Sequence, residues 1–238
     1  MFKSLSAKLS VALLFSAFIV PAHAVQVLTN GTFDTGVTGW TSFVTANGTI
    51  TDPPSPPVGT PTSEQATTQS FNVTGSGASS ALFLNAGAKS FIPGGPQEGG
   101  GVTQTFTLAA DGVATFSANI AGWTSNTVNN LGLLSVLLDG NLMDSHEFVN
   151  APTLPTTLLS TLGFTSSLSA GTHTITLMAT KLTAPGSGIT HQYFDNVSLD
   201  VAQTPLPAAL PMFISGLGVV GALWRRNRKK AQAALAAA

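Results

Sequence analysis

Three carboxylates, Asp139, Asp144 and Glu147, cluster around one Asp-Gly dipeptide in the sequence. Paired carboxylates are the groups that glycoside hydrolysis needs, one as an acid and the other as a base or nucleophile. The separation of the two carboxyl groups decides that chemistry, and a sequence does not give it. Because acidic residues near a turn are more simply explained by solubility, these residues leave a polysaccharide hydrolase or lyase open only as an alternative.

Three histidines, His146, His173 and His191, could serve as metal ligands or as acid–base groups. No two of them stand at helical ligand spacing, and the chain has no cysteine to join them. The sequence also lacks His-Glu-x-x-His, Gly-x-Ser-x-Gly and a phosphate-binding loop. We therefore expect hydrogen-bonded histidines on strands or at the surface, and we predict no catalytic residue.

The large aromatic residues of the central region are Trp40, Trp123 and Tyr193. Such rings stack on the faces of sugars, although burial in a core is their more common fate. Trp40 directly follows a glycine, a setting that favours the core. Trp123 precedes the polar stretch 124–130. Trp123 is therefore the predicted surface platform for a ligand.

The composition narrows the class of protein. Only 8% of the 238 residues are charged, 43% are apolar, and the chain contains 24 Gly, 14 Pro and no Cys. This is too apolar for a disordered tail, too poor in basic residues for a nucleic-acid binder, and a poor fit to a soluble cytosolic enzyme. The Thr, Ser, Gly, Asn and Val of the middle favour β-strands over helices.

The charges are unevenly distributed. Seven of the nine basic residues lie near the two ends, whereas all ten acidic residues lie between 25 and 205 together with only Lys89 and Lys181. The middle therefore has a formal charge of −8. Such a domain repels nucleic acids and acidic lipids and favours divalent cations or neutral ligands.

The first 24 residues have the organisation of a secretory signal peptide. Lys3 and Lys8 precede the apolar run 9–20, and Ala22 and Ala24 form an A-x-A cleavage site. The predicted mature chain begins at Val25, and the alternative is an uncleaved signal anchor.

A second apolar segment, 208–224, carries no charge and is near the minimum length of a transmembrane helix. A basic cluster follows it directly, made of Arg225, Arg226, Arg228, Lys229 and Lys230, and an Ala-rich tail covers 231–238. This pattern predicts a stop-transfer helix that leaves the acidic middle outside the cell membrane and the basic cluster on the cytoplasmic side.

The whole C-terminal region, 204–230, resembles the sorting signal of the PEP-CTERM class, in the variant whose motif reads Val-Pro-Leu-Pro-Ala. The motif 204–208 consists here of Thr204, where the family usually has Val, followed by Pro205, Leu206, Pro207 and Ala208. The resemblance implies export across the inner membrane of a Gram-negative bacterium, transient anchoring, and processing by an exosortase-type membrane protease. The alternative is a plain C-terminal anchor with a Pro-rich hinge.

Between the two ends, residues 25–203 predict one β-sandwich domain, because short alternating or β-branched runs are separated by turn residues. Asp111-Gly112 and Asp139-Gly140 predict two hairpin turns. The stretches 52–60 and 93–101 predict exposed loops rich in Pro and Gly. The expected strands are 25–28, 40–44, 49–51, 70–73, 81–85, 102–108, 113–123, 131–138, 142–148, 160–164, 173–181 and 193–201. Strands at this spacing favour a jelly roll or a related two-sheet sandwich.

Three segments of this domain are similar to galactose-binding-like jelly rolls, which include many carbohydrate-binding modules. They are 30–34 with Gly39-Trp40, 169–175, and the closing segment 193–199. The resemblance implies a structural Ca²⁺ near the paired terminal strands, with Asp34 and Asp195 at the matching positions. Asp195 followed by Asn196 could equally cap a turn.

Together these features predict an exported cell-envelope or matrix protein with one transmembrane helix. It would be anchored in the inner membrane with its domain in the periplasm, and would reach the cell surface or the medium after processing. We expect it to be non-catalytic and to associate with extracellular polysaccharide, and we expect no nucleic-acid partner. The alternatives are a polysaccharide hydrolase or lyase on the same fold and a purely structural surface protein.

Overall fold

A computed structural model describes residues 24–51, 64–90, 92–125, 127, 130–149, 155–182 and 190–203. Among these residues no helix is long and apolar enough to cross a membrane. The expected signal segment up to Ala22, the loop 52–60, and the C-terminal segment 204–238 with its motif, its span and its basic cluster lie outside the described residues.

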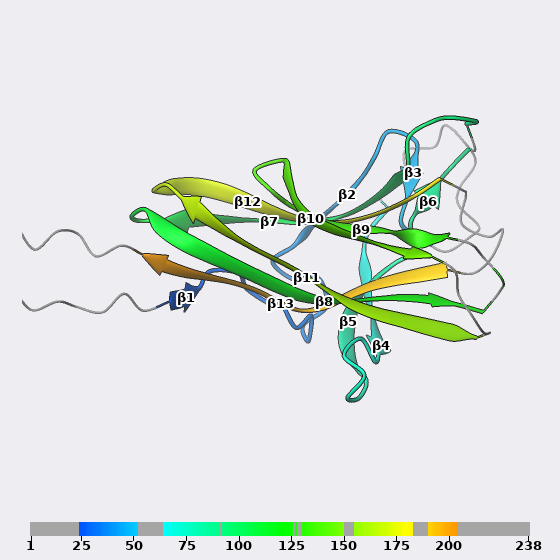
Figure 1. The fold of residues 1–238 in the computed structure, drawn as a ribbon, viewed down its shortest axis with the longest axis horizontal. Helices are drawn as coiled ribbons and strands as arrows, with labels where there is room; N and C mark the ends of the chain where they lie inside the picture. Colours follow the sequence, from blue (N-terminus) through cyan, green and yellow to red (C-terminus); the bar gives the residue numbers. More distant parts are fainter. Residues whose placement is uncertain are drawn as a thin grey trace, which may run out of the picture. The chain divides into compact units, whose positions relative to one another are not determined.

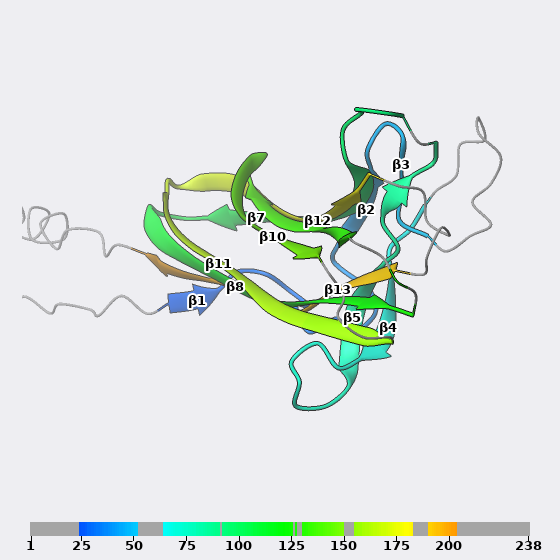
Figure 2. The same cartoon turned by 45° about the vertical axis from the view of Figure 1, so that its right-hand side comes forward.

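The described chain folds into two packed antiparallel sheets (Figures 1 and 2). Sheet A has the order β11-β8-β13-β5-β4, with β1 pairing β13 at its end. Its strands are β1 (Ala24–Gln26), β4 (Thr67–Phe71), β5 (Ser79–Leu84), β8 (Gly112–Thr124), β11 (Thr156–Leu168) and β13 (Thr190–Gln203). The expected all-β sandwich is therefore confirmed.

Sheet B has the order β10-β9-β12-β7-β2. Its strands are β2 (Thr41–Val44), β7 (Glu98–Leu108), β9 (Asn130–Leu138), β10 (Asn141–Val149) and β12 (Gly171–Lys181). A short pair, β3 (Gly48–Thr49) with β6 (Gly87–Ala88), stands beside β7. Most strand positions match the expected ranges, but β6 was not predicted because it has only two residues.

Alternation of side chains separates the core from the surface. In β8, Ala114, Phe116, Ala118 and Ile120 are buried, while the residues between them are exposed or half-buried. The inner faces of both sheets contribute to one core, in which Phe33 and Phe194 are also fully buried. Period 2 is what one buried face of a strand requires, so the sequence pattern located this core.

Trp40 belongs to this core, as predicted. It is only 7% exposed, lies 5.7 Å from the Phe33 ring, and its Nε1 donates to the Asn30 carbonyl at 3.2 Å. The buried indole N–H thus has the partner that it needs.

The hairpin predicted at Asp111-Gly112 is wrong. β7 pairs with β12 and β2 in sheet B, whereas β8 pairs with β11 and β13 in sheet A. The turn therefore carries the chain from one sheet to the other, and Gly112 does not have a positive φ. An Asp-Gly signal marks a reversal of the chain, but it does not say whether the two strands hydrogen-bond to each other.

The hairpin predicted at Asp139-Gly140 is confirmed. Leu138 pairs with Asn141, and the two turn residues have φ values of 51° and 79°. Positive φ at both central residues is the requirement of a type I′ turn, which suits the twist of the flanking strands.

The exposed loop predicted over 93–101 is wrong at its end, because residues 98–101 are the buried start of β7. Gly101 allows a close approach of strands: a Cβ there would stand 1.9 Å from the Leu177 carbonyl oxygen. The Gly-rich composition reflects tight packing and not loop flexibility.

The strands define two ends of the sandwich. At the first, which we call the turn end, lie the connections Ala109–Asp111, Asp139–Gly140 and Ser169–Ala170, together with β1 and the end of β13. Ala24 is paired with Ala202 there, so both termini of the domain leave side by side. At the second, the Lys181 end, β8 and β12 finish and β13 begins (Figure 1).

Candidate functional site

A second hydrophobic cluster lies outside the core, on the outer face of sheet A near the Lys181 end. We call it the outer cluster; it contains Val73, Ala81, Ala121 and Tyr193, with Phe71, Phe83 and Trp123 packed against them. The register explains the grouping: His191 stands opposite Trp123, and Tyr193 stands between Ala121 and Phe83. Four strands therefore contribute apolar side chains to a face that normally meets solvent.

The rings of the outer cluster form two stacked pairs, and Phe83 contacts one ring of each pair. Tyr193 is buried and stacks on Phe71 with centroids 3.9 Å apart and planes 3° apart. Trp123 is half-buried and stacks on His191 at 5.0 Å and 25°. The edge of Phe83 meets His191 at 4.8 Å and 80°. The Trp123–His191 and Phe83–His191 pairs have centroid separations in the range that aromatic pairs prefer, whereas Tyr193 and Phe71 stack more closely.

Polar groups surround these rings. The Tyr193 hydroxyl donates to Gln69 Oε1 at 2.8 Å, which leaves the exposed amide Nε2 of Gln69 as a donor. Thr157, exposed and opposite Trp123 on β11, and Thr67 on β4 add hydroxyls to the same face. A half-buried indole beside neutral donors and acceptors is the chemistry that recognises sugar rings.

The structure therefore places the predicted Trp123 in a ring cluster and brings to it His191, Phe71, Phe83 and Gln69, none of which was predicted as a site residue. Only His191 and Tyr193 carried a usable signal, since they are two residues apart and must share a face if the segment is a strand. The contributions of β4 and β5 depend on the pairing register, which the sequence does not give.

The second predicted pair, Asp34 and Asp195, lies within Coulombic range. Asp195 is 1% exposed and accepts hydrogen bonds from Ser79 Oγ at 2.5 Å and from the Asn196 amide at 2.7 Å. Burial raises the pKa of the Asp195 carboxyl, and the nearby negative charge of Asp34 adds to this effect, while the two hydrogen bonds oppose it. The pair is thus a site of like-charge repulsion.

A Ca²⁺ shell takes six to eight oxygens, and oxygens beside this pair already accept hydrogen bonds within the chain. Asp34 Oδ2 accepts from the Thr32 hydroxyl, and the carbonyls of Asn30 and Gly31 already accept from Trp40 Nε1 and the Val197 amide. Within the described ranges, no three His, Cys, Asp or Glu residues form a group that could hold a metal ion.

The three carboxylates near the β9–β10 turn do not converge. Asp144 accepts from the Gly163 amide of β11 at 2.8 Å and so links the two sheets at their edge. Glu147 pairs with Leu133 on the outer face of sheet B and accepts from Asn130 Nδ2. Asp139 is held in the turn itself. Each carboxylate thus has a separate structural partner.

His173 forms an ion pair with Asp139 at the turn end. Its Nδ1 lies 2.7 Å from Asp139 Oδ2 and its Nε2 lies 2.9 Å from the Ser169 carbonyl. Both partners only accept hydrogen bonds, so both contacts are made together only by the protonated ring. The hydrogen bond to Asp139 first, and then that to Ser169, raises the pKa of His173. Burial alone would raise the pKa of Asp139, but the hydrogen bonds from His173 and from the Thr174 amide outweigh it and lower that pKa.

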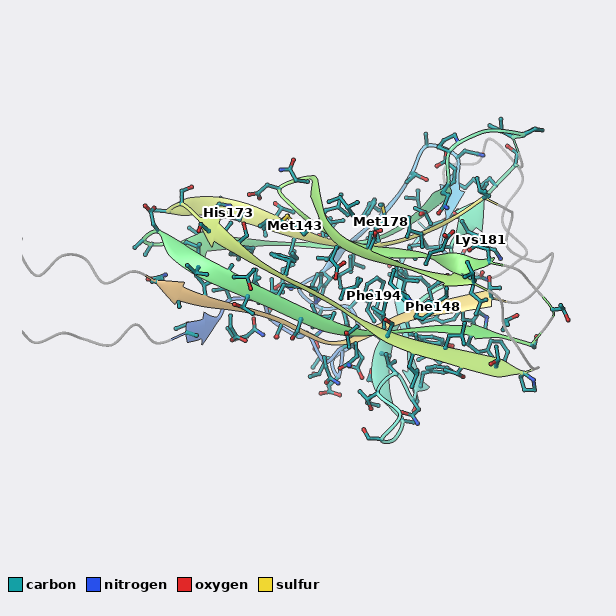
Figure 3. All side chains as sticks on the ribbon, in the orientation of Figure 1. Met143, Phe148, His173, Met178, Lys181 and Phe194 are labelled. Carbon is teal, nitrogen blue, oxygen red and sulfur yellow. The ribbon has the colours of Figure 1, made fainter. Side chains whose placement is uncertain are left out.

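Lys181 differs from His173, because its environment disfavours the charged form. The sequence did not predict it as a site residue. It is 4% exposed, and its Nζ donates to Thr190 Oγ1 at 2.8 Å. Burial lowers the pKa of this amine to about 8. Figure 3 labels His173 and Lys181 at opposite ends of the sandwich.

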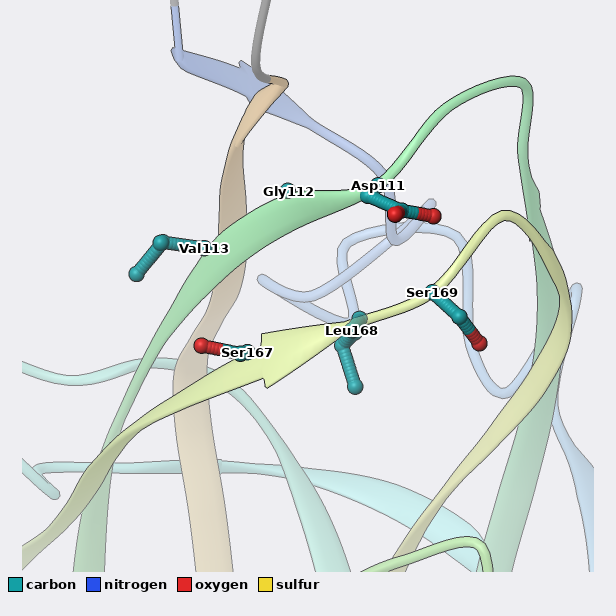
Figure 4. Close-up of a pocket in the computed structure, with 6 residues that line it drawn as sticks. All are labelled: Asp111, Gly112, Val113, Ser167, Leu168 and Ser169. Carbon is teal, nitrogen blue, oxygen red and sulfur yellow. The ribbon is translucent and has the colours of Figure 1, made fainter.

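A surface hollow of about 330 Å³ lies at the turn end between the start of β8 and the end of β11 (Figure 4). Its lining residues are Asp111, Gly112, Val113, Ser167, Leu168 and Ser169. The Asp111 carboxylate accepts from the Ala170 amide at 2.7 Å, so it stabilises the neighbouring turn. No aromatic ring is among the residues that line this hollow.

No protein-family model matches the chain, and no curated protein matches it. Solved structures share a general likeness at low identity. A Stig cyclase from Fischerella sp. TAU is 13% identical over 76% of this chain and 99% of its own, with a TM-score of 0.42. The CBM22-1 xylan-binding domain of Paenibacillus barcinonensis Xyn10C is 12% identical over 78% and 99%, with a TM-score of 0.41. An α-L-arabinofuranosidase, MgGH51, is 15% identical over 76% of this chain and 27% of its own, with a TM-score of 0.42.

Proposed function

We propose that this protein is an exported, non-catalytic envelope or matrix protein whose β-sandwich binds extracellular polysaccharide through the Trp123 side of the outer cluster. The observation that carries the proposal is the ring stack of Trp123 on His191, held outside the core over Tyr193 and Phe83. A ring fixed in orientation offers a sugar face a contact that loses little side-chain entropy on binding.

The non-catalytic part rests on the divergence of Asp139, Asp144 and Glu147. A glycosidase holds its two carboxyl groups across one bond, about 5 to 10 Å apart, and leaves them available to substrate. Asp144 and Glu147 instead point to opposite faces of β10, and each accepts a hydrogen bond within the chain. This favours a binding module over a hydrolase or lyase.

The delivery part of the proposal rests on the sequence. The signal segment 1–24, the motif 204–208, the apolar span 208–224 and the basic cluster 225–230 support export, anchoring in the inner membrane and processing by an exosortase-type protease. The fold accommodates such a tether, because β13 ends at Gln203 at the turn end, far along the strand from His191. The ring stack lies at the start of β13 and Gln203 at its end, in what we propose is a jelly roll of the galactose-binding type.

Retention on immobilised polysaccharides tests the binding proposal. We expect the purified protein to be retained by at least one of β-glucan, xylan, mannan or starch, and Trp123→Ala to weaken that binding at least tenfold, or about 1.4 kcal/mol. Val113→Ala is the matched control, because Val113 is exposed on the same strand and face at the turn end. Equal binding by the Trp123 and Val113 variants, or no retention of the wild type, would overturn the proposal and favour a purely structural role.

A further inference from the structure

Neither lysine of the domain is a fully exposed cation: Lys181 is buried, and the side chain of Lys89 is 26% exposed and paired with Glu64. Lys181 is buried with its amine on Thr190, and Lys89 lies 3.3 Å from the buried carboxylate of Glu64. The sequence contains no other Lys or Arg between 25 and 203. The domain therefore has no fully exposed Lys or Arg side chain to pair with an anionic ligand.

The acidic residues are divided between interior and surface: Glu64, Glu98 and Asp195 are buried, whereas the other acidic residues of the described chain reach solvent. Asp34, Asp111, Asp139 and Glu147 are exposed, and Asp144 and Asp200 are half-buried. Their field extends over about a Debye length, roughly 8 Å at physiological ionic strength, and among them Asp139 is partly neutralised by His173. A polyanion approaching any side of this domain meets repulsion.

The described strands also place no Lys or Arg on the face of sheet A that carries the outer cluster. Around Trp123 the register places Thr157, Leu159, Thr67 and Gln69, which are all uncharged. The charged side chains that the described strands place on this face are Asp195 and Asp200, both acidic. The donors beside the rings are amide and hydroxyl groups, which suit sugar hydroxyls and do not neutralise a carboxylate or sulfate.

We infer that the ligand of the outer cluster is an uncharged polysaccharide, and that polymers rich in uronate, sulfate or phosphate are rejected. This inference rests on the proposed function, whose binding site it uses. It adds the chemical class of the ligand, which follows from the pairing of Lys89 with Glu64 and the burial of Lys181 and not from the rings, since rings stack on neutral and acidic sugars alike.

The test compares polymers that differ only in charge. Soluble β-glucan, mannan and starch are each paired with the derivative whose primary hydroxyls are oxidised to carboxylates. Binding of the full protein is measured in EDTA at low salt and at pH 8, above the range in which an ordinary histidine is charged. We expect the neutral form to bind at least tenfold more tightly than its oxidised form, and the ratio to shrink at 0.5 M salt.

A new cation at the site sharpens the test. Thr157→Lys places an amine opposite Trp123, and Thr107→Lys places one on the exposed outer face of sheet B as the matched control. We expect the Thr157 variant to raise affinity for the oxidised polymer at least fivefold and to leave the neutral polymer within twofold. The Thr107 variant should change neither.

The outcomes separate the two proposals. If the wild type binds an oxidised polymer as tightly as, or more tightly than, its neutral parent, the inference is overturned while glycan binding through Trp123 stands. If neither form of any polymer binds in a Trp123-dependent manner, the proposed function fails and the inference fails with it.

Discussion

The two ends of the sandwich shift the pKa of a buried basic group in opposite directions. At the turn end, His173 lies between Asp139 and the Ser169 carbonyl, and its pKa is raised. At the Lys181 end, the amine donates to a neutral hydroxyl, that of Thr190, and burial lowers its pKa to about 8. One environment stabilises the charge that it encloses, and the other penalises it.

The difference accords with the proposed function, in which the binding surface lies near the Lys181 end and the turn end carries stabilising contacts. The turn end carries a type I′ turn, the His173–Asp139 pair and the Asp111 contact with Ala170, all of which tie neighbouring turns together. The Lys181 end carries a costly buried amine and, on the outer face beside it, the half-buried Trp123–His191 stack. Unfavourable groups and incompletely buried rings commonly mark functional regions.

The largest expected effect comes from removing the central ring of the outer cluster. Tyr193→Ala should destabilise the protein by about 3–5 kcal/mol, because it leaves a cavity beneath Phe71 and Phe83. Tyr193→Phe should cost only about 1 kcal/mol, the contribution of the hydrogen bond to Gln69. Denaturant unfolding measures both. If the two variants differ by less than 1 kcal/mol, the outer cluster does not stabilise the Lys181 end.

The second test removes the penalised charge. Lys181→Met should stabilise the protein at pH 7 by about 2 kcal/mol, since an apolar side chain of similar length replaces a desolvated ammonium and its hydroxyl contact. The folded pKa of Lys181, about 8, lies below the unfolded value near 10.5. The wild type therefore gains stability as pH rises from about 8 to 10.5, and the advantage of the variant should disappear over that range. A gain that is constant from pH 7 to 10.5 would contradict this explanation.

The third test addresses the stabilised charge. Asp139→Asn keeps an acceptor for the Thr174 amide and a residue that tolerates the φ of 51°, but it removes the negative partner of His173. Because the folded pKa of His173 is raised above 6.5, its contribution is fully present below pH 6.5 and is lost as pH rises through the folded value. The variant should lose about 1–2 kcal/mol at pH 5.5 and almost nothing at pH 9.

Asp111→Asn is the matched control for this experiment, because the Asp111 carboxylate supports the same turn through the Ala170 amide. Its cost should not depend on pH between 5.5 and 9. An NMR titration of the imidazole should show the pKa of His173 falling in the Asp139 variant. If it does not fall, the pair does not explain the stability of the turn end.

The sequence predicted the architecture of both ends better than their chemistry. Alternation located the sheets, and Gly140 after Asp139 located a true hairpin, because these signals are local. The sequence could not distinguish the hairpin at Asp139 from the sheet-to-sheet crossing at Asp111, since both need only a reversal of the chain. The burial of Lys181 and the stacking of Trp123 on His191 depend on which strands become neighbours, and that is decided by packing over the whole domain.

The smallest expected effect concerns Asp34 and Asp195, which lie away from both charged ends. Because the pKa of Asp195 is raised, the penalty of its charge is fully present above the folded pKa and absent well below 3.8. Asp34→Asn should therefore stabilise the protein at pH 7 by up to about 1 kcal/mol, and at pH 3 it should have no effect. Asp200→Asn, on the same face, is the control and should give a smaller gain.

Melting in Ca²⁺ and in EDTA distinguishes repulsion between Asp34 and Asp195 from metal binding. Repulsion alone predicts that Asp34→Asn gives the same gain in both conditions. If Ca²⁺ raises the melting temperature of the wild type and Asp34→Asn abolishes that rise, a cation bridges the two carboxylates, and their hydrogen bonds to Thr32 and Ser79 must rearrange to admit it.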